Sequence, residues 1–99
     1  MSQYKLTAEA RNDLRAITRF TRHAWGRAQM VRYLQRLKAT FQVLVEEPHL
    51  GRPEPSAKGV LRFEQGRHVI FFERGEQLLI IRVLHDRMLP KLHLDSDEE

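Results

Sequence analysis

The chain has 99 residues, a length typical of a single domain, and its 41% hydrophobic and 30% charged composition excludes a disordered protein. The absence of cysteine excludes disulfides, thiolate metal sites and a cysteine nucleophile, and without a signal peptide or an apolar run of about 18 residues we expect a cytoplasmic protein. Residues 1–94 hold all 17 Lys and Arg but nine of the 13 acidic residues, a formal charge of +8 that attracts nucleic acid or an acidic protein segment.

The N-terminal quarter predicts a short strand followed by an amphipathic helix. Residues 4–7 favour a strand, and Thr7 suits the helix N-cap because its hydroxyl can accept a backbone N–H of the first turn. The helix is expected over residues 8–23, and Gly26 breaks its pattern. Its buried side is predicted from residues at helical spacing: Ala10, Leu14, Ile17, Thr21 and Trp25.

Arginines occupy roughly the opposite side of this helix. They are Arg11, Arg15, Arg19 and Arg22. This stripe could contact DNA or an acidic surface, and a solvated helix face is the alternative interpretation.

A second helix is predicted over residues 27–46 and ends before Pro48. Its apolar residues repeat at steps of four and three, a strip that suits an antiparallel helix partner across a short turn. They are Met30, Leu34, Leu37, Phe41 and Leu44. Residues 48–59 contain three prolines and two glycines and predict a connecting loop.

Three strands are predicted after the loop, over residues 60–64, 67–73 and 77–84. The segments between them are short enough for hairpin turns, so the strands should form an antiparallel meander. The predicted order is β-α-α-β-β-β, an α+β fold with a helical hairpin on one face of a small antiparallel sheet. We expect one domain over residues 1–94 and a disordered acidic tail over residues 95–99.

The strands at 67–72 and 78–84 are apolar on both faces instead of alternating. One helical hairpin covers one face, so the other face is expected to remain open and to bind a partner. The alternatives are a homodimer or cover by the C-terminal segment. Side chains expected to contribute to the open face are Leu61, Phe63, Ile70, Phe72, Leu78, Ile80 and Leu84.

Short motifs spread over residues 4 to about 93 resemble the ParE toxins of the RelE/ParE superfamily, the toxin halves of type II toxin–antitoxin pairs. The pieces, in family order, are Tyr4-Lys5-Leu6-Thr7, Asp13-Leu14, Trp25-Gly26 with Tyr33, Pro48-His49-Leu50-Gly51-Arg52, Gly59 with Arg62, His68-Val69-Ile70-Phe71, and Ile81-Arg82-Val83-Leu84-His85 with Arg87-Met88. The resemblance implies the fold predicted above and an acidic, partly disordered ParD-like antitoxin that wraps the toxin.

The superfamily has two functional branches: ribosome-dependent mRNA endonucleases of the RelE type, and ParE toxins that poison DNA gyrase so that cleaved DNA accumulates. An endonuclease needs a base, an acid and cations, for which this chain offers Arg62, Arg82 and His85. The tyrosines lie far from this end of the chain, and Asp86 would repel a phosphate. We therefore interpret the chain as a gyrase inhibitor that acts by binding. The endonuclease, and a degenerate toxin that only binds an antitoxin or a promoter complex, remain alternatives.

Contact residues follow from this interpretation. The predicted antitoxin-binding residues are Phe63, Ile70, Phe72, Ile80, Arg82 and Leu84, of which Phe72 and Leu84 are expected to be exposed. The gyrase-binding candidates are Arg87, Met88 and Lys91, beside Leu89-Pro90, which departs from the family pattern. Packing of Met88 on the sheet is the alternative interpretation. Arg82 is expected to pair with a carboxylate or a chain terminus. The five histidines lack ligand spacing, so neither a metal nor a cofactor is predicted.

Overall fold

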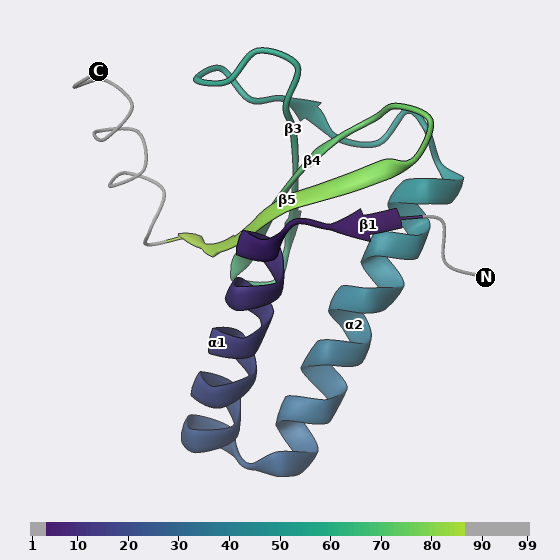
Figure 1. Ribbon diagram of the computed structural model, residues 1–99. Helices are drawn as coiled ribbons and strands as arrows, with labels where there is room; N and C mark the ends of the chain where they lie inside the picture. Colours follow the sequence, from purple (N-terminus) through teal and green to yellow (C-terminus); the bar gives the residue numbers. More distant parts are fainter. Residues whose placement is uncertain (1–3, 87–99) are drawn as a thin grey trace.

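The computed structural model of the chain describes residues 4–86, in which two helices pack against one five-stranded sheet (Figure 1). The elements in chain order are β1 (Tyr4–Leu6), α1 (Ala8–Trp25), α2 (Arg27–Glu46), β2 (Arg52–Pro53), β3 (Leu61–Gln65), β4 (His68–Glu73) and β5 (Leu78–His85). The predicted α+β fold and order are confirmed, with the short β2 as an addition. Neither helix in this range is long and apolar enough to cross a membrane.

The sheet has the order β1-β5-β4-β3-β2 and is mixed, not antiparallel throughout as predicted. The antiparallel meander of β3, β4 and β5 is confirmed. However, β1 lies parallel to β5, where Tyr4 pairs with Leu78 and Leu6 with Ile80. The whole domain separates these two strands in sequence, so no turn signal could specify their direction. β2 was not predicted because it has only two residues. One of them is Pro53, which has no N–H to donate and therefore suits the edge strand that β2 forms.

The helix ends follow local sequence signals. The Thr7 hydroxyl accepts the Ala10 N–H at 3.0 Å, which confirms the predicted N-cap, and donates to the Ile81 carbonyl at 2.6 Å. Gly26 ends α1 with φ of +92°, a conformation that favours glycine, and its N–H reaches the Arg22 carbonyl. α1 runs two residues further than predicted, whereas α2 has the predicted bounds.

The main core, the helix-facing cluster, lies between the helices and the sheet. It consists of Ala10, Ile17, Leu37, Phe41, Leu44, Ile70, Phe72, Leu78, Ile80 and Val83. Most residues of the two predicted stripes belong to this cluster or pack against it. Thr21 is buried and Met30 is half-buried outside the cluster, whereas Trp25 is 71% exposed, contrary to the prediction. In Figure 1 the hairpin extends away from the sheet towards its turn, so the last turn of α1 has no sheet to pack on.

A smaller outer cluster lies on the opposite face of the sheet. Val69, Phe71 and Leu84 form it, with Val60 and Ile81 packed around them. None of the three is more than 4% exposed, so the broad open apolar face predicted from the strands is absent from the described residues. The expectation that Phe72 and Leu84 are exposed is therefore wrong.

A β-bulge in β5 explains part of the missing alternation. Phe71 pairs with Arg82 and Phe72 pairs with Ile80, which leaves Ile81 as an extra residue. The extra residue reverses the facing of everything after it. Leu78, Ile80 and Val83 consequently share the helix-facing cluster although their spacing breaks the two-residue period.

The double role of Thr7 gives a stability prediction. Thr7→Ala removes the N-cap and the bond to Ile81, so the free energy of unfolding in urea should fall by about 1–2 kcal/mol. The matched control is Thr18→Ala on the same helix, whose hydroxyl bonds only the Leu14 carbonyl and whose loss should change stability by less than about 0.5 kcal/mol. Equal losses in the two variants would contradict the prediction.

Candidate functional site

The edge of β5 beyond Ile80 is completed by α1 instead of a strand. β1 pairs only with Leu78, Leu79 and Ile80. Just beyond, the Asp13 carboxylate accepts the Val83 backbone N–H at 2.9 Å. It also accepts two N–H groups of Arg82, Nε at 2.8 Å and Nη2 at 3.0 Å.

The bidentate contact with Asp13 stabilises the charged form of Arg82. The hydrogen bonds to Asp13 raise the pKa of Arg82 above its usual value. The expectation that Arg82 pairs with a carboxylate is confirmed, and the partner lies in the chain itself. Because both oxygens of Asp13 are engaged, the guanidinium serves to join α1 to β5.

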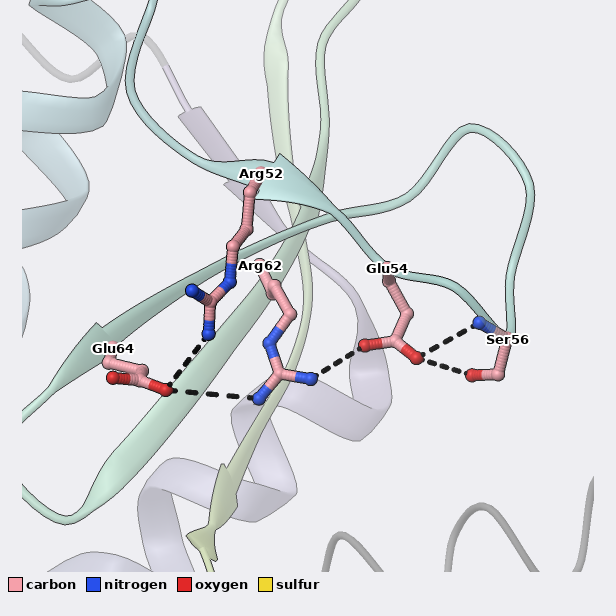
Figure 2. A network of polar contacts seen from close by, with 5 residues as sticks. All are labelled: Arg52, Glu54, Ser56, Arg62 and Glu64. Atoms are coloured by element: carbon pink, nitrogen blue, oxygen red, sulfur yellow. Dashed lines mark hydrogen bonds and ion pairs between the residues drawn. The ribbon is translucent and has the colours of Figure 1, made fainter.

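A second polar network lies over the sheet face that points away from the helices (Figure 2). Arg62 contacts Glu54 with Nη1 to Oε1 at 3.0 Å, and both side chains are largely buried. Ser56 donates its backbone N–H and its hydroxyl to the other Glu54 oxygen. Burial alone would raise the pKa of Glu54, but these bonds and the Arg62 charge outweigh it, so the pKa lies below its usual value.

The same network covers apolar surface. The Arg62 guanidinium carbon lies 5.8 Å from the centre of the Phe71 ring, within cation–π range. Arg52 and Arg62 both approach Glu64, at 3.4 and 4.0 Å. The chain thus supplies its own polar cover for part of the outer cluster.

A histidine pair lies at the other end of β4 and β5. The Tyr33 hydroxyl from α2 hydrogen-bonds Nδ1 of His68. The His68 ring packs edge-on against His85, with centroids 5.4 Å apart, and His85 Nδ1 lies 2.9 Å from Asp86 Oδ1. Burial, and then the charge of His85, lower the pKa of His68 to about 4. His68 is therefore neutral at neutral pH.

Two hollows flank this histidine pair and share Phe20, His68 and His85. One of about 360 Å³ is lined by Asp13, Ala16, Ile17, Phe20, His68, Val83 and His85. The other, of about 430 Å³, is lined by Phe20, Thr21, Ala24, Trp25, Gln29, Tyr33, Arg67, His68 and His85. Between residues 4 and 86, no three His, Cys, Asp or Glu side chains gather in a way that could hold a metal ion.

The structure engages all three endonuclease candidates in contacts within the chain, although Arg62 and Arg82 lie in one row across the sheet on either side of Phe71. Arg62 lies in the network on the outer face, and Arg82 is bound to Asp13. His85 packs on His68. Each of the three is engaged inside the chain, and no acid–base pair with a free cation forms from them in the described part.

The six predicted antitoxin-binding residues do not share one surface. Ile70, Phe72 and Ile80 are fully buried against the helices, and Leu84 is buried on the opposite face. Phe63 is partly buried beside the helix-facing cluster, and Arg82 is about one third exposed. Antitoxin contact by these six stays a prediction, and only Phe63 and Arg82 offer accessible side chain. The gyrase-binding candidates Arg87, Met88 and Lys91 lie outside the described residues.

Several other residues of these sites are not predicted by the sequence. Glu54 is 5% exposed although it stands between two prolines in a polar loop, and nothing local indicates its buried partner. The contact between Tyr33 and His68 joins residues from separate elements. Phe20, which is 67% exposed, did carry a signal, since it lies beside Arg19 and off the apolar stripe.

Comparison with known proteins identifies the family. Residues 4–90 match the family model described as ParE toxin of the type II toxin–antitoxin system parDE. Toxin ParE1 of Caulobacter vibrioides is 36% identical over 95 residues, covering 95% of this chain and 99% of that protein. Toxin ParE of Escherichia coli is 36% identical over 91 residues, covering 89% and 88%. The chain therefore belongs to the ParE toxin family of type II toxin–antitoxin systems.

A solved structure supports the fold. It is described as a chromosomal ParDE toxin–antitoxin system from P. aeruginosa and superimposes with a TM-score of 0.73. The match covers 86% of this chain and 96% of that chain at 24% identity. At this identity the similarity supports the arrangement of helices and sheet.

The buried histidine predicts a pH dependence of stability. Unfolded His68 takes up a proton near pH 6.5, whereas folded His68 does so only near pH 4. The unfolded state therefore binds more protons between these values, and acidification from pH 6.5 to 4 should lower the free energy of unfolding by up to about 3 kcal/mol through this group.

Two variants isolate this contribution. His68→Asn keeps an amide near the Tyr33 hydroxyl but cannot titrate, so its unfolding free energy should fall less steeply between pH 6.5 and 4. His49→Asn, at an exposed histidine, should follow the wild type. Urea unfolding at several pH values measures both, and parallel curves for His68→Asn and wild type would refute the assignment.

Proposed function

We propose that this ParE family toxin inhibits DNA gyrase and that a cognate ParD-like antitoxin neutralises it by binding. The observation that carries the proposal is the 36% identity to two proteins named ParE toxins, over nearly the full length of each. Gyrase is cytoplasmic, so the proposal assigns the toxin to the same compartment.

The geometry supports action by binding instead of catalysis. Cleavage of RNA at its own 2′-hydroxyl requires a base, an acid and cations aimed at one phosphate. Arg62 and Arg82 are each bound to a carboxylate of the chain: Arg62 to Glu54 on the outer face, and Arg82 to Asp13, which lines a hollow with His68 and His85. Two observations support mRNA cleavage, the contact between His68 and His85 and the Tyr33 hydroxyl on His68. Against it, both candidate arginines are already bound to carboxylates of the chain.

Charge supports an acidic antitoxin. Residues 1–94 carry a formal charge of +8, and an acidic segment is attracted to such a body. Gyrase contact is proposed for the C-terminal residues Arg87, Met88 and Lys91. Two cations there would favour an acidic surface of the enzyme, in contacts that salt weakens.

The test is a gyrase supercoiling reaction read for linear DNA. The wild-type protein should cause cleaved DNA to accumulate, and Arg87→Glu/Lys91→Glu should lower the potency at least about tenfold by reversing both charges. Lys5→Glu/Lys58→Glu makes the same charge change at exposed positions elsewhere and should keep wild-type potency. A wild-type protein that traps no cleaved DNA would refute gyrase inhibition. If the Arg87→Glu/Lys91→Glu variant keeps full potency, the gyrase contact must lie on another surface of the toxin.

A second variant separates the two branches. His85→Gln keeps a polar side chain but removes the titrating ring, so gyrase inhibition should persist within about twofold if His85 is not a general base. Circular dichroism should show that the variant is folded. Ribosome-dependent mRNA cleavage by the wild type, abolished in the folded His85→Gln protein, would establish the endonuclease instead.

A further inference from the structure

The helical hairpin formed by α1 and α2 has an unbalanced charge that the proposed function does not use. Between Asp13 and Glu46 the sequence contains no acidic residue and seven cations. They are Arg15, Arg19, Arg22, Arg27, Arg32, Arg36 and Lys38, and all seven are exposed.

None of these cations forms an ion pair with residues 4–86. Arg15 and Arg32 donate to neutral side chains, Asn12 and Gln29. Like charges spaced three or four residues apart on a helix repel one another, so this arrangement is unfavourable to the isolated hairpin. Such a surface gains most from a partner with a row of negative charges.

Two aromatic side chains stand out among these cations. Trp25 and Phe20 are 71% and 67% exposed, more than any other large hydrophobic residue in the described part. Both come from the second half of α1, where the hairpin extends away from the sheet (Figure 1). Arg19 and Arg22 lie within one turn of Phe20, so cations and rings alternate along the helix.

The rings share one hollow with groups that can donate hydrogen bonds. Phe20 and Trp25 line the hollow of about 430 Å³ together with Gln29 and Arg67. No Asp or Glu is among its described lining residues. An apolar wall with amide and guanidinium donors is suited to a flat, acceptor-rich ring such as a nucleobase.

We propose that this surface binds single-stranded DNA, with the hairpin arginines on the phosphates and the rings of Phe20 and Trp25 stacked on bases. Exposed aromatic side chains within a basic surface are the combination that binds unpaired strands. In a duplex the faces of the bases are stacked on one another, so a duplex could contact the cations of this surface but could not stack on its rings. The choice of DNA over RNA rests on the proposed function, because a gyrase-trapped break offers unpaired DNA next to the enzyme. The binding itself needs no gyrase.

Trp25 is the only tryptophan of the chain, so its fluorescence reports directly on this site. A 20-nucleotide single strand titrated into the full-length protein should quench Trp25, because bases stack on the indole. The duplex of the same sequence should bind at least about tenfold more weakly and quench little. Anisotropy of a labelled strand at several salt concentrations measures the charge contribution.

Paired variants separate the two contributions. Arg19→Gln/Arg22→Gln should weaken binding and flatten the plot of log affinity against log salt by about 1.4, since each lost phosphate contact accounts for about 0.7. Lys5→Gln/Lys58→Gln, at exposed cations outside the hairpin, should leave the slope unchanged. Phe20→Ala should weaken binding about tenfold, whereas Val43→Ala, at an exposed apolar residue of α2, should not.

Several results would overturn the proposal. One is the absence of Trp25 quenching by the single strand, and another is equal affinity for the duplex. A clear preference for RNA of the same sequence would reject DNA as the ligand. Equal quenching by polyglutamate would assign the surface to an acidic protein segment. A failure of gyrase inhibition together with intact quenching would refute the proposed function and leave the strand-binding surface in place.

Discussion

The edge of β5 that faces away from β4 is the constraint on which the arrangement of the two layers depends. β1 covers only three residues of this edge, and the chain then turns into α1. Thr7 continues the edge through its N–H to the Ile80 carbonyl and its hydroxyl to the Ile81 carbonyl. Asp13 completes it by accepting the Val83 N–H. Because a buried backbone group without a partner is costly, these bonds hold α1 at one place along the sheet.

Three arginines of the sheet region differ in role from the cations of the hairpin. They are engaged internally: Arg82 binds Asp13, Arg62 binds Glu54, and Arg74 donates to three carbonyls near the end of α2. Arg74 also lies over the Phe72 ring at 5.3 Å and so joins the second helix to the core. The hairpin cations have no carboxylate partner among the described residues, and Arg15 and Arg32 donate only to neutral side chains. Composition alone, a formal charge of +8 over residues 1–94, conceals this division.

Local signals predicted the parts of the fold that depend on neighbours in sequence. The cap at Thr7, the break at Gly26 and the three-stranded meander all follow from residues within a few positions of one another. The missed features join distant segments. β1 runs parallel to β5 although nearly the whole domain lies between them in sequence, and Tyr33 of α2 contacts His68 of β4. The family could be recognised from the sequence because the resemblance rests on motifs spread over the whole chain. The face of the sheet on which each strand side chain lies could not be predicted.

The bulge at Ile81 shows how one local irregularity misdirects a functional inference. Strands without alternation predict two broad apolar faces that need cover, but one extra residue turns Val83 inward and Leu84 outward. The outer face then holds only a small cluster, and Arg62 lies over its Phe71. Every large hydrophobic side chain with at least 40% exposure between residues 4 and 86 belongs to α1 or α2. Apolar contact with a partner in this part of the chain therefore favours the helical layer, where the unpaired cations also lie, over the sheet.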